Sequence, residues 1–375
     1  MPNWTESMEQ TFEFYVVDPN TWKDVRRLDN VISATINRDS SVETLGSATF
    51  DITESVGECY IRTYLVTVQN GIKEKHPLGT FLVQTPSSTF DGRLRSVTMD
   101  AYTPLLELKE KYPEMGHFIP KNTNILNAAY DLIKLNSISV PSDATSTQET
   151  TNYPYMRAPV IHEESVDSNL VLKSNFISDP NETVLQYVTN LLSVYDYKLD
   201  LDEKGQVSFR KDQRSDRLQP RWTYDDSNSS ILYPEISMNH DLYGIPNKVI
   251  VVYSNNNGVP CVGIAENNDE NSPTSIPRRG RVIIHRETNP NFVGAASDAE
   301  AKEYAEELLK KLSTVEYTIT YTHGYTPVRV GDCVRLNYER AGITDVKAKV
   351  ISQSITCEPG CPVSETAVYT KKLWR

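Results

Sequence analysis

The sequence has little of what most enzymes and cofactor-binding proteins need. Its 375 residues include only 5 cysteines and 16 glycines. Five cysteines are too few for a disulfide scaffold, and an odd number favours reduced, buried thiols. There is no glycine-rich phosphate loop, no nucleophile elbow and no dinucleotide-binding fingerprint. We therefore expect a protein that is not an enzyme and that has no cofactor, no catalytic residues and no metal site.

Positive charge and long apolar runs are also scarce. Lys and Arg number 38 against 50 for Asp and Glu, which gives a formal net charge of −12. This charge repels the phosphate backbone and disfavours sequence-specific binding of nucleic acid. The first residues do not resemble a signal peptide, and no apolar run approaches the ~18 residues of a membrane span. We expect a chain made in the cytoplasm, with no membrane segment.

The first hundred residues have the alternation of β-strands. The turns Gln69-Asn70-Gly71 and Phe90-Asp91-Gly92 separate extended stretches, as hairpin turns do. The predicted strands are 12–16, 31–36, 48–52, 60–68, 78–84 and 94–99. Short strands at this spacing indicate a barrel or sandwich in residues 1–103.

Residues 104–235 predict a mixed α/β region. Helices are expected at 104–111, at 122–135 and after Asp179-Pro180, where an N-cap and a first-turn proline coincide. A hairpin follows, with strands 197–201 and 206–210 joined at the turn 202–205. The stretch 140–160 is rich in polar residues and is predicted to be a surface loop.

Residues 236–375 predict a second β-barrel that includes one helix. Ser297-Asp298-Ala299-Glu300 is a capping box that opens helix 297–312, and its apolar stripe is expected to lie against the barrel. Strict alternation over 315–322 indicates a strand with one wet face. The other predicted strands are 247–253, 281–285, 328–330, 333–338, 346–355 and 363–373. The fold class is therefore mainly β with an α+β insert.

The C-terminal cysteines are the strongest candidates for metal chemistry. Cys357 and Cys361 face each other across a turn, and Cys333 and His323 lie on nearby predicted strands. One loose pair of thiols does not make the two ligand pairs of a structural zinc site, so buried free thiols are favoured over a metal or a disulfide.

Three other constellations have simpler explanations. His162-Glu163-Glu164 lacks the second histidine of a zinc-protease helix and is expected on the surface. Asp200 and Asp202 resemble a calcium loop, but Lys211 stands where its bidentate carboxylate belongs, so a hairpin turn is expected. His240-Asp241 is expected to belong to a turn.

The order of these elements resembles the baseplate or tail hub proteins of tailed bacteriophages and related injection particles. The resemblance covers about residues 12–373 and is one of layout, with no signature motif. Its parts are the strand Leu78 to Val83 with Asp100-Ala101-Tyr102, the helix and hairpin from Val184 to Phe209, the strand Asn247 to Val251, helix 297–312, and Val330 to Leu336.

The resemblance implies two tail-tube-like β-barrel domains in each subunit of a homotrimer, which matches a hexameric tube. It implies a structural virion protein that joins the tail tube to the central spike or tail tip and lines the DNA conduit. The expected partners are further copies of the chain, a tube or distal tail protein, a spike or tail-tip protein, and the tape-measure protein. Assembly is expected in the host cytoplasm.

A carbohydrate-binding β protein is the alternative. The 21 tyrosines against 9 phenylalanines suit either large protein interfaces or a sugar-binding surface. A phage receptor-binding or cell-wall-binding module therefore remains the second hypothesis.

Overall fold

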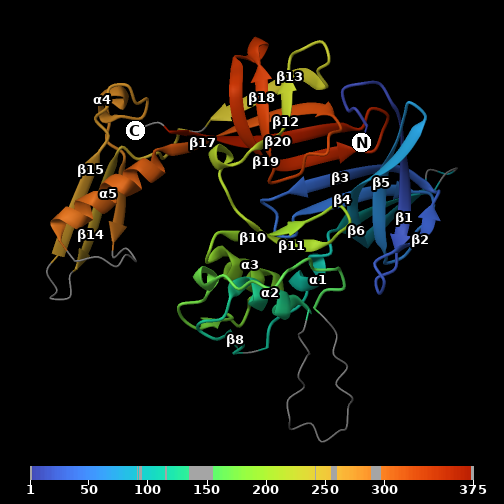
Figure 1. Ribbon diagram of the computed structural model, residues 1–375, viewed down its shortest axis with the longest axis horizontal. Coiled ribbons are helices and arrows are strands. Elements are labelled where there is room, and N and C mark those ends of the chain that lie inside the picture. The colour runs from blue at the N-terminus through green and yellow to red at the C-terminus, as the bar shows by residue number, and fades with distance from the viewer. Residues whose placement is uncertain are drawn as a thin grey trace, which may run out of the picture.

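The computed structural model (Figure 1) consists of two β units, a mixed middle unit and a small α/β unit that stands to one side. Asp91 of one predicted turn, most of the predicted loop 140–160, Asp241, and the end of the chain from Leu373 lie outside the described residues. The structure describes residues 2–90, 92, 95–114, 116–134, 155–240, 242–254, 260–288 and 297–372.

The first β unit contains the first seven strands and confirms the predicted β pattern of this region. These are β1 (Glu9–Val17), β2 (Asp24–Leu28), β3 (Val31–Asp39), β4 (Gly46–Ile52), β5 (Tyr60–Gln69), β6 (Ile72–Phe90) and β7 (Arg95–Tyr102). They pair in the order β2-β1-β5-β6-β7-β4-β3. Alternate residues of β4 are buried, so its apolar face packs into the core that the curved sheet surrounds.

The second β unit is built from strands on both sides of residue 236. It contains β12 (Pro220–Asp225), β13 (Leu232–His240), β17 (Thr314–Gly324), β18 (Cys333–Tyr338), β19 (Ile343–Thr356) and β20 (Pro362–Lys372), with a 3-10 turn Glu339–Ala341. Strand β12 precedes the predicted boundary at 236 but belongs to this unit, because it pairs with β18 in parallel. Together the two β units form one 13-stranded sheet.

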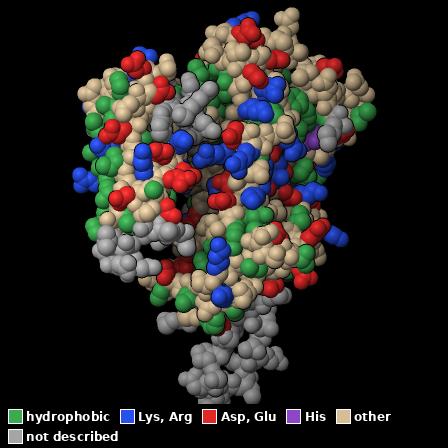
Figure 2. Space-filling model, turned by 60° about the vertical axis from the view of Figure 1, so that its left-hand side comes forward, with side chains coloured by type: hydrophobic (Ala, Val, Ile, Leu, Met, Phe, Trp, Pro, Cys, Tyr) green, Lys and Arg blue, Asp and Glu red, His purple; other side chains and the backbone are tan. Residues whose placement is uncertain are grey.

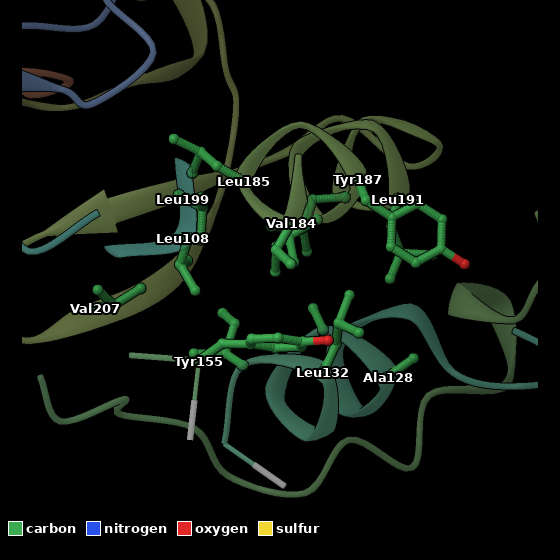
Figure 3. Close-up of a cluster of buried hydrophobic side chains, with 14 of the residues drawn as sticks. Leu108, Ala128, Leu132, Tyr155, Val184, Leu185, Tyr187, Leu191, Leu199 and Val207 are labelled. Carbon is green, nitrogen blue, oxygen red and sulfur yellow. The ribbon is translucent and has the colours of Figure 1, made fainter. Parts of the chain in front are cut away.

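The middle unit lies below the two β units in Figure 1 and has its own apolar core, shown in Figure 3. Tyr155 and Met156, at the end of the predicted surface loop, are buried in this core, so that part of the prediction is wrong. Its elements are α1 (Leu106–Lys109), β8 (Phe118–Ile119), α2 (Ile125–Lys134), β9 (Phe176–Ile177), α3 (Val184–Ser193), β10 (Tyr197–Leu201) and β11 (Val207–Lys211), with 3-10 turns Ser168–Leu170 and Ser215–Arg217.

Helix α3 begins later than its sequence signal. The predicted cap at Asp179-Pro180 is wrong, because Thr183 caps the helix. The Thr183 hydroxyl accepts from the backbone N of Gln186 at 3.2 Å, and the Gln186 side chain accepts from the backbone N of Thr183 at 3.1 Å. This reciprocal pair satisfies two backbone donors at the helix start.

The insert unit lies between β13 and β17 in the chain and stands apart from the β units in Figure 1. It contains β14 (Lys248–Ser254), β15 (Pro260–Glu266), α4 (Ile276–Arg279), β16 (Ile284–Thr288) and α5 (Asp298–Leu312). Its strands form a separate sheet in the order β15-β14-β16. A core of its own joins α5 to β14 and β15.

The expectation that helix 297–312 packs against the second barrel is therefore wrong. The apolar stripe itself is as expected, since Ala301, Ala305 and Leu309 are fully buried. They pack against the sheet of the insert unit, where a Cβ on Gly263 of β15 would lie 2.0 Å from the carbonyl oxygen of Ala301. Glycine at this position lets the helix backbone lie directly on the strand.

Candidate assembly surface

The two β units share one strand order. Strands β3, β4, β5, β6 and β7 pair as β3-β4-β7-β6-β5. Strands β13, β17, β18, β19 and β20 follow in the same order along the chain and pair as β13-β17-β20-β19-β18. All of these pairs are antiparallel, so the second unit repeats the five-strand arrangement of the first.

The repeat extends to single residues. The β6–β7 ladder is irregular just after the pair Val83–Ala101, and the β19–β20 ladder is irregular just after the pair Val350–Ala367. The backbone N of Val83 donates to the carbonyl oxygen of Cys59 at 2.9 Å, and that of Val350 donates to the carbonyl oxygen of Asp332 at 2.9 Å. A β-bulge at the same place in both ladders fixes which residues are equivalent.

The two units are joined edge to edge by β3 and β19. Their antiparallel pairs run from Asp39 opposite Ser352 to Thr35 opposite Thr356. Ile355 of β19 is fully buried and belongs to the core of the first unit, together with Cys361 and Val363. The second unit thus completes the core of the first.

A buried polar network lies beside this junction. Gln353 donates through Nε2 to Glu365 at 2.7 Å and accepts from Arg38 Nη1 at 3.2 Å, which links the two units. Tyr321 donates to the other oxygen of Glu365, and His323 Nε2 lies 3.5 Å from Glu365. Burial, followed by the charge of Glu365, raises the pKa of Tyr321 well above its ordinary value, so its hydroxyl stays protonated and donates.

The turn 202–205 of the middle unit sits between both β units. From the first unit, Arg62 Nη2 donates to the carbonyl oxygen of Lys204 at 3.1 Å, and Trp22 Nε1 donates to the same oxygen at 2.8 Å. From the second unit, Arg329 Nε lies 3.0 Å from the Glu203 carboxylate. Gly205 has a φ of +74°, and a Cβ at this position would lie 3.0 to 3.3 Å from the side chains of Thr80, Trp22 and Pro104. The predicted hairpin is confirmed, and its turn fixes three units together.

A cleft of about 710 Å³ opens where these three units meet. Nine Lys and Arg residues and five Asp and Glu residues line it, and Figure 2 shows Lys and Arg gathered near the middle of one face. Several of these charges are paired, as Lys198 is with Asp212 at 2.8 Å and Arg329 is with Glu203. The cleft is therefore a charged seam between units.

All five cysteines are free thiols, and most of them are buried. Cys333 and Cys361 are buried, and Cys357 is half-buried. Burial raises the pKa of Cys361 to about 12 and that of Cys333 and Cys357 above the ordinary thiol value. Such thiols are protonated and poorly reactive at neutral pH. Among the described residues, no group of three or more His, Cys, Asp or Glu side chains is placed to hold a metal ion.

The other candidate residues remain apart from one another. His162 is half-buried, donates through Nε2 to Asn127 Oδ1 at 2.8 Å, and lies against Tyr130 with ring centroids 5.3 Å apart, whereas Glu163 and Glu164 are exposed. The surface expectation is therefore wrong for the histidine alone. Asp202 shapes the hairpin turn by accepting from the backbone N of Gln206 at 2.7 Å.

Comparison with known proteins gives matches in structure alone. No family model matches the chain, and no curated protein matches its sequence. The 43 kDa tail protein of prophage MuSo2 from Shewanella oneidensis is 10% identical with a TM-score of 0.62, covering 96% of this chain and 98% of that one. A tail protein from Neisseria meningitidis MC58 is 13% identical with a TM-score of 0.61, covering 97% and 98%.

The chain has the fold of a phage tail protein. The resemblance found in the sequence is thus confirmed for the fold, as is the mainly β fold class. A chain in the PdpA–VgrG complex of Francisella is also similar, at 10% identity and a TM-score of 0.56, covering 97% of this chain and 58% of that one. No helix of the described residues is both long and apolar enough to cross a membrane.

Sequence reasoning did not locate the edge that joins the two units. Strand β19 was expected, but its partner β3 lies more than 300 positions earlier in the chain, as the 315 positions between Arg38 and Gln353 illustrate. The signal shared by both halves of the sequence was limited to the three strands that end each unit, which are β5, β6 and β7 in the first and β18, β19 and β20 in the second.

Proposed function

We propose that the protein is a structural component of a phage-type tail, the hub that joins the tail tube to the spike or tail tip. The observation that carries the proposal is the repeated β unit, because one chain then supplies two similar units to a ring. Three chains would supply six, which suits the end of a sixfold tube. The fold shared with two phage tail proteins over nearly the whole chain supports the same placement in a virion tail.

The hub as proposed works by assembly and performs no catalysis. Its net charge of −12 suits a conduit through which DNA slides without binding. Partners at its two faces would be a tube or distal tail protein and a spike, tail-tip or tape-measure protein. The similar Francisella chain is found in a complex of PdpA with VgrG, which supports assembly with other proteins.

The burial of two tyrosines in the second β unit weakens the carbohydrate-binding alternative. Tyr224 and Tyr321 of the tyrosine-rich strands are buried, at 1% exposed each, and belong to the core of the second β unit. Buried rings give no platform on which a sugar can stack.

Cryo-electron microscopy of tails that contain the chain tests the proposal. We expect three copies in one ring at the end of the tube, on the tail axis. Six copies per ring, or a position on a peripheral fibre, would refute the hub and favour the receptor-binding alternative. Particles that assemble and eject DNA normally without the chain would also refute it.

A further inference from the structure

The junction inside the chain uses one strand edge of each β unit. Each unit also has a second edge, the counterpart of the one that the other unit uses, which has no partner strand among the described residues. Within the chain, β3 of the first unit pairs with β19 of the second. By the repeat described above, β13 is the counterpart of β3, and β6 is the counterpart of β19. The described residues pair β13 with β17 alone, and they pair the last part of β6 with β7 alone.

Both free edges are exposed. Met238 of β13 is 48% exposed and Phe90 of β6 is 70% exposed, whereas Ile36, which is the counterpart of Met238, is fully buried in the core that Ile355 of β19 joins. Exposed strand edges of this kind pair readily with another strand. Met238 of the second unit is thus exposed to water, whereas the equivalent Ile36 of the first unit is covered.

We propose that β13 of one copy pairs with residues 85–90 of β6 in the next copy, in the register of the internal β3–β19 junction. The partner is a second copy of this chain, joined head to tail. The inference rests on the proposed function only in supposing that the chain forms a ring. It adds which two strands pair between copies and which residues lie opposite each other. A head-to-tail contact that repeats the internal one closes into a ring when its rotation divides a full turn without a rise along the axis, and it gives an open filament otherwise.

The equivalent bulges give the register. Because Val83 corresponds to Val350, Ser87 corresponds to Ser354, whose partner in β3 is Asn37. On the other edge, Asn37 pairs with Ser47 of β4 as Asn239 pairs with Thr318 of β17. Ser87 of one copy should therefore lie opposite Asn239 of the next.

The same register places apolar groups together. Counting on from Ser87, Ser88 lies opposite Met238 and Phe90 lies opposite Ile236, which is half-buried at the margin of the second unit's core. In the internal junction, the counterpart of Phe90 is Cys357, whose backbone N donates to the carbonyl oxygen of Ala34 at 2.9 Å. Phe90 would thus pack against the core of the neighbouring second unit, as Cys357 packs against the core of the first.

The copy-to-copy junction differs from the internal one at a single backbone donor. The carbonyl oxygen of Ile351 accepts from the backbone N of Ser40, directly after β3, and the backbone N of Cys357 donates to Ala34 of β3. Gln353 and Ile355 lie two residues from these along the strand, so their backbone groups also point toward β3. The counterpart of Gln353 is Pro86, which has no N–H to donate. Ser354, and hence Ser87, then lies in a non-hydrogen-bonded pair, where Cα atoms are about 4.5 Å apart.

This spacing allows a disulfide, for which Cα atoms lie roughly 4.4–6.8 Å apart. In the full-length protein, Ser87→Cys with Asn239→Cys should form bonds between chains under mild oxidation, seen as dimer and trimer bands without reductant. Asn37→Cys with Ser354→Cys is the matched control, because it should form a bond within one chain and leave the mass unchanged. Each single variant measures the background from the native thiols.

A pair shifted by one residue tests the register. Ser87→Cys with Met238→Cys places the two thiols on opposite faces of the sheet, so interchain bonding should fall about tenfold or more. Bonding of this shifted pair equal to that of the aligned pair overturns the register. No interchain bond in the aligned pair, while the Asn37 and Ser354 control bonds, overturns the proposal whether the protein is monomeric or oligomeric.

A charge on the free edge gives an independent measurement. Met238→Lys should weaken self-association by about tenfold or more while the monomer keeps its fold, because the side chain is exposed before assembly. Tyr233→Lys, on the same strand outside the proposed register and 43% exposed, should have little effect. Equal effects of the two variants would overturn the edge assignment.

These outcomes are separate from those of the hub proposal. Absence of the chain from tail particles would refute the hub and leave the strand pairing of the purified protein intact. A threefold ring on the tail axis, in which the Ser87→Cys and Asn239→Cys double variant forms no interchain bond, would keep the hub and refute the pairing.

Discussion

The two β units share a strand order but differ at one turn and at one edge. The first unit joins β3 to β4 through residues 40–45, whereas the second places residues 241–313, including the insert unit, between β13 and β17. A hairpin turn holds its two ends side by side, so it accepts a folded unit without altering the sheet. At the edge, the first unit has its core completed by the second, whose own edge strand β13 pairs with β17 alone in the part of the chain that the structure describes.

We expect the largest effect when a residue in the core of the first unit is replaced by its counterpart from the second unit. Met99 of β7 and Glu365 of β20 are equivalent and fully buried, but only Glu365 has polar partners. Met99→Glu should lower the free energy of unfolding by about 3–5 kcal/mol, because it buries an unpaired charge. Urea denaturation measures this, with Met99→Leu as the control. A loss as small as that of the control would show that the core of the first unit admits water.

The insert unit should respond as a separate body. Leu309→Ala removes a fully buried side chain from its small core and should destabilise this unit by about 2–5 kcal/mol. Limited proteolysis should then cleave within 241–313 first, while the β units stay resistant. Glu307→Ala, at an exposed position of the same helix, should give the wild-type cleavage pattern. Cleavage of all units at the same rate would mean that the insert unit is integral to the second β unit.

The junction between the units should weaken when Gln353 loses its amide. Gln353→Ala leaves Glu365 and Arg38 without one partner each and should lower the free energy of unfolding by about 1–3 kcal/mol. The half-buried neighbour Ser354→Ala should change it far less. Equal losses in the two variants would contradict a special role for the polar network.

The smallest effect concerns pH and the first unit alone. Burial raises the pKa of Glu13 on β1, but hydrogen bonds from Lys75 and Tyr15, with the charges of Lys75 and Lys73, outweigh burial and lower it from 4.5 to about 2. A lowered pKa stabilises the fold above about pH 4.5, and this contribution is lost as the pH falls through about 2.

Glu13→Gln tests this pH dependence. The wild type should be the more stable at neutral pH, and its advantage should shrink as the pH falls between those two values. A stability difference between wild type and variant that stays constant from about pH 7 to about pH 2.5 would contradict the assignment. Equilibrium unfolding at several pH values measures it.

Local patterns predicted most elements because each depends on neighbours in the sequence. The alternation of 315–322 became β17, and Ser297 caps α5 by accepting from the backbone N of Glu300 at 3.3 Å. The partner of α5 could not be predicted, since an apolar stripe fits any apolar face and says nothing about which sheet supplies it. The close approach at Gly263 and the core shared with β14 and β15 show which sheet supports the helix.

The repeat of the β unit was equally hidden. Equivalent positions hold Met99 and Glu365, so that a thioether and a carboxylate occupy one place in the fold. Backbone pairing sets the arrangement of the strands, and it tolerates either side chain when burial or hydrogen bonding is satisfied. Similarity of this kind is visible in ladders and bulges, and not in residue identity.

The contribution of Ile355, Cys361 and Val363 to the first core also has a consequence for synthesis of the chain. During translation, β1 to β7 emerge from the ribosome long before these three residues are synthesised. In that interval the β3 edge of the first unit has no partner strand. Pairings so distant in sequence form slowly, and open edges favour aggregation in the meantime. A stalled or truncated product that ends before β19 should therefore require a chaperone or be degraded, and only the complete chain can seal the unit with which translation began.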